Sequence, residues 1–220
     1  MRYRSEIDGL RSIAVVPVIL FHAGFELFSG GFVGVDVFFV ISGYLITVIL
    51  IEDLENKRFS IIGFYERRAR RLLPALFFVM VISIPFAWMW MLPDPLENFG
   101  QSLVSTSLFS NNILLILTSA DYWEIKATYK PLLHTWSLAV EEQYYIIFPI
   151  FLLITWSLGR KKVLWLIFII AAISLILSEY GWRNDINSNF YSTPSRPWEL
   201  LTGSIGAFFV YYKGVQKNNL

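Results

Sequence analysis

The chain of 220 residues contains no cysteine and only two histidines. The absence of cysteine excludes disulfides and thiolate metal sites, and two histidines argue against a histidine-rich metal site. Charged residues are also scarce, at 16% of the chain, where a soluble domain has about 25%. The formal net charge is +1, and no segment resembles a nucleic-acid-binding module. We therefore expect neither a metal nor a nucleic acid as partner.

Apolar residues dominate what is present. They make up 55% of the chain, aromatic residues make up 17%, and the mean hydropathy is +0.54. The apolar runs are long enough to cross a lipid bilayer as helices. We predict an all-α fold, a polytopic transmembrane helix bundle formed by the whole chain. The predicted spans, about six in number, are residues 12–28, 33–51, 72–92, 138–157, 163–180 and 197–213.

The stretch 101–119 is a seventh candidate span, but it is rich in Ser, Thr, Asn and Gln. Because such side chains face lipid poorly, we predict an outer loop or a re-entrant piece there. With six spans and a cytoplasmic N-terminus, most of the 18 Lys and Arg residues fall on the cytosolic side, as the positive-inside rule requires. A seventh span would satisfy that rule about as well, so the polarity of the stretch decides.

Arg11 and His22 lie in the first apolar segment. Ionisable residues are costly inside a membrane and usually functional there. On a helix, the two side chains share a face and are about 16 Å apart along the axis. The alternative is that Arg11 only sets the orientation of the helix and that His22 is a satisfied histidine of the bundle.

A cluster of arginines precedes the third predicted span, in a segment, 52–71, that we expect to be a cytosolic linker. On a helix, Arg68 and Arg71 are three residues apart and share a face, which suits them to bind a phosphate or pyrophosphate. The alternative is that the cluster only sets orientation and contacts anionic lipid headgroups.

The fourth predicted span begins with Trp136 and Ser137, and Glu141 follows one turn later. Ser137, Glu141 and either Tyr144 or Tyr145 align at helical spacing, which predicts a polar stripe in the bundle. The alternative is an interfacial belt of aromatic residues, with the next residue, Glu142, simply staying in water.

Two further sets of polar residues lie at the predicted outer side. Asp36 is just inside the outer end of the second span, near the depth of His22. Arg196 and Glu199 are three residues apart at the start of the last span, where we interpret them as a structural ion pair, with a substrate role as the alternative. Gly203 and Ala207 follow and predict a close approach between helices.

Five motifs in this order resemble those of membrane acyltransferase family 3, from residue 3 to about residue 210. They are residues 8–11 (DGLR) with His22, 33–44 (VGVDVFFVISGY), 68–74 (RARRLLP), 134–143 (HTWSLAVEEQ) and 196–199 (RPWE). The family O-acetylates glycans of bacterial surfaces and cell walls. The sequences of the fourth motif and of residues 190–196 resemble those of the subgroup that carries an extracytoplasmic SGNH-type esterase domain after the bundle.

The resemblance implies a bacterial inner (cytoplasmic) membrane protein with acetyl-CoA as acyl donor and an envelope glycan as acceptor. Arg11, Arg68 and Arg71 would hold the phosphates of the donor, and His22 would act as general base or accept the acyl group. Asp36 and Glu141 would orient His22 or raise its basicity, and the sequence does not say which of them touches it. A role in binding the substrate or in stabilising the structure would fall to Trp136, Ser137, Arg196 and Glu199.

The family bundle has roughly ten spans against about six here, and no SGNH domain is present in the sequence. We therefore expect a truncated member whose partners are the missing C-terminal helices and SGNH domain, or a separate esterase-like protein. Two other hypotheses stay open. One is a transporter or flippase, because membrane carboxylates and histidines also build proton relays, although no internal repeat with broken helices favours it. The other is an inactive fragment of an acyltransferase.

Overall fold

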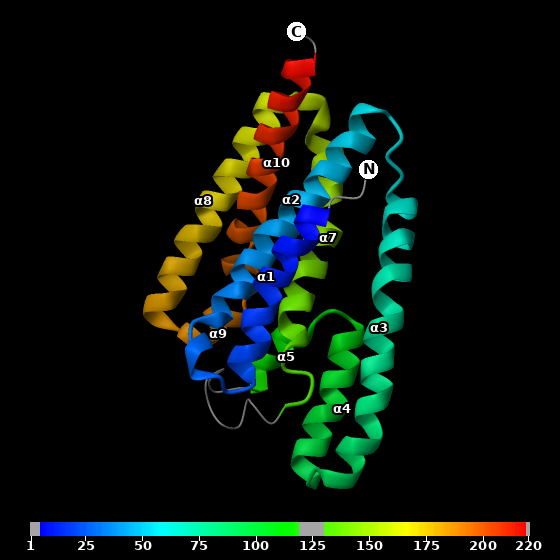
Figure 1. Cartoon of the computed structure of the whole chain (residues 1–220), viewed down its shortest axis with the longest axis vertical. Coiled ribbons are helices and arrows are strands. Elements are labelled where there is room, and N and C mark those ends of the chain that lie inside the picture. The colour runs from blue at the N-terminus through cyan, green and yellow to red at the C-terminus, as the bar shows by residue number, and fades with distance from the viewer. Residues whose placement is uncertain (1–4, 119–129, 219–220) are drawn as a thin grey trace. The chain divides into compact units, whose positions relative to one another are not determined.

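The computed structural model describes residues 5–118 and 130–218, and every regular element in these ranges is a helix (Figure 1). This confirms the all-α prediction. The contacts divide the chain into two compact units where the sequence predicted one bundle. The first unit is Met1–Arg58, Phe151–Leu177 and Arg196–Leu220, and the second unit is Phe59–Ile150 and Ser178–Ser195.

Four helices of the described ranges are long and apolar enough to cross a membrane, by length and composition. They are Gly31–Glu55, Ile61–Trp90, Thr135–Leu158 and Arg160–Asn184. They overlap the predicted spans 33–51, 72–92, 138–157 and 163–180. Of the other two predicted spans, 197–213 lies in the last helix, whereas 12–28 is one helix only up to His22. Neither helix is in this set, and the first carries three charged residues near its start. These helices indicate a multi-pass membrane protein.

In the first unit, α2 packs against both α1 and α10. Glycines of the η2 turn and of α2 allow the contact with α1, because a methyl group at Gly31 or Gly34 would overlap the backbone oxygen of Pro17 or Ala14. The elements of this unit are α1 (Ser5–His22), η1 (Glu26–Phe28), η2 (Gly31–Val33), α2 (Gly34–Glu55), η3 (Trp156–Leu158), most of α8 (Arg160–Asn184) and α10 (Pro197–Asn218).

The contact between α2 and α10 is closest at two glycines. A methyl group at Gly43 would overlap the backbone oxygen of Leu200, and one at Gly203 would overlap that of Val40. Beside them, the hydroxyl of Thr47 donates to that of Ser204 at 2.7 Å. Small residues and hydroxyl pairs of this kind hold membrane helices together by letting their backbones approach.

We predict that Gly203→Ala destabilises the protein by about 1–3 kcal/mol, because an added methyl group must push α10 away from α2. Gly206→Ala, on the same helix, is the control, since nothing lies within 4 Å of the methyl group it adds. The measurement is the free energy of unfolding of both variants in mixed detergent micelles. Equal stabilities of the two variants would contradict the close packing at Gly203.

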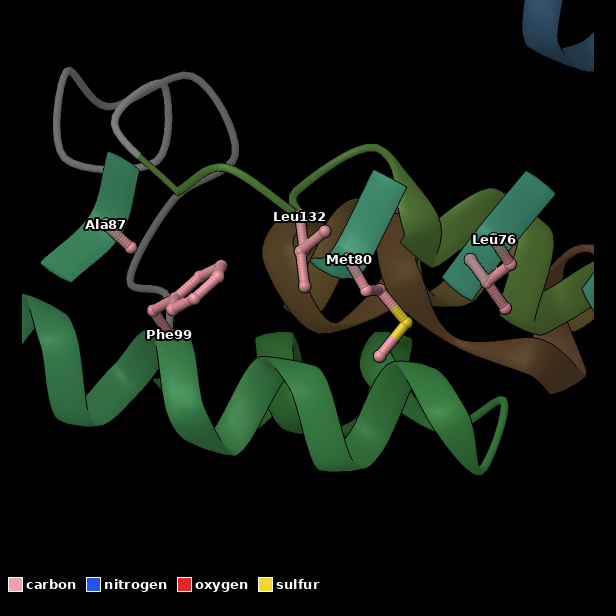
Figure 2. Close-up of a cluster of buried hydrophobic side chains, with 5 residues drawn as sticks. All are labelled: Leu76, Met80, Ala87, Phe99 and Leu132. Carbon is pink, nitrogen blue, oxygen red and sulfur yellow. The ribbon is translucent and has the colours of Figure 1, made fainter. Parts of the chain in front are cut away.

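The second unit has a core between α3 and α4, shown in Figure 2. Leu76, Met80 and Ala87 of α3 pack with Phe99 of α4 and with Leu132. The elements of this unit are α3 (Ile61–Trp90), α4 (Pro93–Ser107), α5 (Asn111–Thr118), most of α7 (Thr135–Thr155), α9 (Ile186–Tyr191) and η4 (Thr193–Ser195).

The stretch 101–119, predicted to be an outer loop or a re-entrant piece, is not an irregular loop, because its described part, up to residue 118, lies mostly in α4 and α5. Whether it is re-entrant stays a prediction. Four of its polar side chains are buried, those of Ser102, Thr106, Asn111 and Asn112. The amide nitrogen of Asn111 donates to the hydroxyl of Thr135 at 2.7 Å, and that of Asn112 donates to the hydroxyl of Thr193 at 2.9 Å. Polarity therefore marks packing between helices here. Residue 119 lies outside the described residues.

The segment 52–71, expected to be a cytosolic linker, is helical at both ends, because α2 continues to Glu55 and α3 begins at Ile61. Helix α3 begins at Ile61, where the hydroxyl of Ser60 caps it by accepting from the backbone N–H of Gly63 at 3.2 Å. A serine at this position satisfies one of the free N–H groups of the first turn. The arginine cluster therefore lies on the first part of a long helix, which fixes the directions of its side chains.

Candidate active site

Helix α1 carries Arg11, whose guanidinium group lies against α2. Its Nη2 donates to the hydroxyl of Ser42 at 3.5 Å, and its central carbon is 5.3 Å from the ring centroid of Phe38. The Nε atom of Arg11 is buried and has no hydrogen-bond partner in the described part of the chain. A buried donor left unmatched is costly.

His22 is the last residue of α1, and its side chain is exposed. Its Nδ1 is 2.8 Å from the backbone oxygen of Val18, one turn back. A carbonyl oxygen only accepts hydrogen bonds, so Nδ1 carries the proton and donates. In the neutral ring, Nε2 is then the nitrogen with the lone pair. The helix thereby selects the tautomer that a base or nucleophile needs.

Asp36, Arg196 and Glu199 meet in the first unit. Nη1 of Arg196 donates to Asp36 at 3.0 Å and to Glu199 at 2.8 Å. The side chain of Glu199 is only 1% exposed, whereas that of Asp36 is 38% exposed. One guanidinium group thus links the start of α2 to the start of α10. The ion pair predicted between Arg196 and Glu199 is present, and Asp36 joins it.

Arg68 makes three hydrogen bonds to one carboxylate in the second unit. Its Nε donates to both carboxylate oxygens of Glu142, at 2.8 and 2.9 Å, and its Nη2 donates to one of them at 2.6 Å. Its guanidinium carbon lies 3.4 Å from the ring centroid of Tyr145. Glu142 and Tyr145 are both on α7, so Arg68 joins α3 to α7.

Glu141 is buried next to this pair. It accepts a hydrogen bond of 2.6 Å from the hydroxyl of Tyr145, and it lies 4.0 Å from Nη2 of Arg68. Of the two tyrosines that the sequence left open, Tyr145 is therefore the partner of Glu141. Ser137, the third member of the predicted stripe, donates to the backbone oxygen of His134 at 3.2 Å.

Trp136 and Arg71 have different surroundings. Trp136 is buried, with ring centroids 4.7 Å from Phe190 and 5.8 Å from Tyr191, which makes it part of the packing of the second unit. Arg71 is exposed on α3. It is three positions after Arg68, so both leave α3 on the same face.

The structure therefore places the predicted residues in two groups. Arg11, His22, Asp36, Arg196 and Glu199 belong to the first unit, and Arg68, Arg71 and Glu141 to the second. Within each unit the ion pairs are clear. Which carboxylate serves His22 stays a prediction.

Sequence reasoning missed Glu142. It was expected to stay in water as one alternative, but its side chain is buried and paired with Arg68. The signal in the sequence was two adjacent acidic residues in an apolar helix, which cannot both be buried without a cation nearby. The position of α3 beside this part of α7, which no pattern predicted, supplies that cation.

Each unit, taken by itself, offers guanidinium groups of the kind that phosphates of an acyl-coenzyme A donor would need, and their binding of that donor stays a prediction. Arg71 is exposed, 23% of the side-chain surface of Arg68 remains exposed, and Arg11 has a donor without a partner. Guanidinium groups bind phosphate through parallel hydrogen bonds, which a lysine cannot make.

The model of a protein family described as acyltransferase domain matches residues 4–219. The chain is 35% identical over 212 residues to the peptidoglycan O-acetyltransferase OatA of Listeria monocytogenes, covering 94% of this chain and 34% of that protein. It is 36% identical over 213 residues to the O-acetyltransferase OatA of Staphylococcus aureus, covering 94% and 35%. The chain thus spans about a third of the length of these curated relatives. No solved structure matches. The match over nearly the whole chain shows that this protein belongs to the acyltransferase family 3.

Proposed function

We propose that this chain is the membrane part of an O-acetyltransferase, which moves an acetyl group from cytosolic acetyl-CoA to a sugar hydroxyl of an envelope polysaccharide. By similarity to the relatives named above, the polysaccharide is peptidoglycan. Membership of the acyltransferase family supports group transfer over the transporter hypothesis.

The observation that carries the proposal is the state of His22. Its Nδ1 proton is held by the carbonyl of Val18, so in the neutral ring the lone pair is on Nε2, as a base at that nitrogen requires. In the proposed reaction, Nε2 takes the proton of the acceptor hydroxyl while the oxygen attacks the thioester carbonyl, and the coenzyme leaves as thiolate and takes up a proton. The alternative route, with Nε2 accepting the acyl group first, uses the same tautomer.

Arg11, on the same helix as His22, would orient the acyl donor along that helix. Because the two residues are about 16 Å apart along α1, phosphates at Arg11 would leave the acyl end near His22. Arg68 and Arg71 would supply the other phosphate contacts. Asp36 and Glu141 are the candidates for orienting His22, and the sugar would bind near Asp36, on the outer side.

The proposed location is the bacterial cytoplasmic membrane, with a cytoplasmic N-terminus. In this proposal, the acceptor glycan lies outside, and further helices with an SGNH-type domain, or a separate esterase-like protein, complete the enzyme.

Mass spectrometry of envelope glycans tests the proposed activity. Cells that express the gene should contain O-acetylated muropeptides, and cells without it should lack them or contain far fewer. The second part of the test feeds membranes with acetyl-CoA labelled in the acetyl group, and the label should appear on the glycan. Unchanged acetylation after removal of the gene would contradict the proposal.

Single cysteines test the proposed orientation, since the chain has no cysteine of its own. Arg58→Cys and Asn184→Cys lie at exposed positions that the topology places on opposite sides. We expect an impermeant thiol reagent added to intact cells to label the cysteine at position 184 and not the one at position 58, which should react only after the membrane is opened. The reverse pattern would overturn the orientation.

A further inference from the structure

Glu142 holds Arg68 along one edge of its guanidinium group. The three hydrogen bonds, of 2.6 to 2.9 Å, use both oxygens of the carboxylate. The carboxylate is buried, with 8% of its side-chain surface exposed, whereas 23% of the surface of Arg68 is exposed. A bidentate pair of this kind fixes the plane of the guanidinium group as well as its position.

Tyr145 fixes the face of the same group. Its ring centroid lies 3.4 Å from the guanidinium carbon, a stacked cation–π contact. The ring is itself held, because its hydroxyl donates to Glu141 at 2.6 Å. Arg68 is thus constrained on one edge and on one face, by side chains that all belong to α7.

The remaining edge of Arg68 is available for a ligand. A guanidinium group has five N–H hydrogens, and the bonds to Glu142 involve only those on Nε and Nη2. Nη1 has no hydrogen-bond partner among the described residues and is not among the buried atoms. Arg71, three residues further along the same face, adds a second cation.

We propose that Glu142 is a positioning residue, which holds Arg68 in the orientation that binds a phosphate of the acyl donor. This inference rests on the proposed function, because it requires a donor that carries phosphate groups. A free arginine loses rotamer freedom when it binds a ligand, and an arginine already held by a carboxylate and a ring does not. The gain appears as tighter binding of phosphate.

The proposal and plain electrostatics predict opposite changes in phosphate binding when the charge of Glu142 is removed. Glu142 is negative, so removing its charge should strengthen a general attraction between phosphate and the arginines. If Glu142 instead positions Arg68, removing its charge should weaken the binding of phosphate. A third possibility, that Glu142 only stabilises the fold, predicts equal losses for donors with and without phosphate.

The experiment compares two donors, acetyl-CoA and S-acetylpantetheine, which lacks the phosphates, using liposomes that hold the protein together with the parts that complete the enzyme. For Glu142→Gln we expect KM for acetyl-CoA to rise about tenfold, with KM for S-acetylpantetheine and kcat for both donors unchanged. Glu66→Gln is the matched control, because it breaks the exposed pair between Glu66 and Arg70 on the same helix, and it should change neither KM. The rate with S-acetylpantetheine also shows that each variant is folded.

A second variant tests whether Glu142 acts through Arg68. Arg68→Lys should show the same donor-selective rise in KM, and the double variant Arg68→Lys with Glu142→Gln should be no worse than either single change. A lower KM for acetyl-CoA in Glu142→Gln, an unchanged KM, or equal losses with both donors would overturn the positioning role while leaving the proposed function intact. Failure of the unaltered protein to use acetyl-CoA, or to prefer it over S-acetylpantetheine, would overturn both.

Discussion

Replacing His22 with alanine is expected to lower the rate of acyl transfer by about 10²- to 10⁴-fold, the range for loss of a general base. His22 is the last residue of α1, and its hydrogen bond to Val18 leaves Nε2 as the basic nitrogen. No other histidine shares this helix. The measurement is the rate of transfer of labelled acetyl groups to glycan, made at equal amounts of inserted protein.

The control for this variant is His134→Ala, which removes the only other histidine of the chain. His134 is exposed and immediately precedes α7, and the proposed reaction gives it no role. Its variant should therefore retain nearly full activity. Retained transfer in His22→Ala, or equal losses in the two variants, would show that His22 does not carry the chemistry.

Replacing Arg196 with alanine is expected to destabilise the protein by about 3–5 kcal/mol, the cost of leaving a buried charge unpaired. Nη1 of Arg196 binds Asp36 and Glu199 at once, and Glu199 is almost fully buried. Without the guanidinium group, two carboxylates would face each other between α2 and α10. The free energy of unfolding in mixed micelles measures this loss.

Two comparisons make the result specific. Arg183→Ala removes an exposed pair with Glu179 on α8 and should cost no more than about 0.5 kcal/mol. The double variant Arg196→Met with Glu199→Met removes the buried charge together with its partner and should recover most of the lost stability. A stability of Arg196→Ala close to that of the unaltered protein would mean that the cluster does not hold α2 and α10 together.

The sequence predicted much of the helical architecture, because long apolar runs in a membrane leave the backbone little choice but helix. It also predicted the close approach at Gly203 and the pair between Arg196 and Glu199, since both depend on spacing along one helix. The same local logic left 101–119 as an outer loop or a re-entrant piece. It could not predict that Asn111 and Asn112 are buried, because they are buried through contacts with residues far along the chain.

In the candidate site, too, the sequence predicted what depends on spacing along one helix and missed contacts between helices. The face shared by Arg11 and His22 follows from helix geometry alone, and so does that of Arg68 and Arg71. The pairing of Arg68 with Glu142 and the stacking on Tyr145 depend on which helices are neighbours, and α3 and α7 are not consecutive in the chain, since α4 and α5 lie between them. Periodicity carries no information about that choice, which is why Glu142 was not singled out.

The most direct test of the central claim uses sealed vesicles in which the protein is oriented with Arg58 toward the lumen. Labelled acetyl-CoA is inside the vesicles, and the glycan acceptor is only outside. We predict that label appears on the outer glycan with the unaltered protein and with His134→Ala, and that it falls to background with His22→Ala. Transfer that requires acetyl-CoA on the same side as the glycan, or that persists without His22, would contradict the proposal.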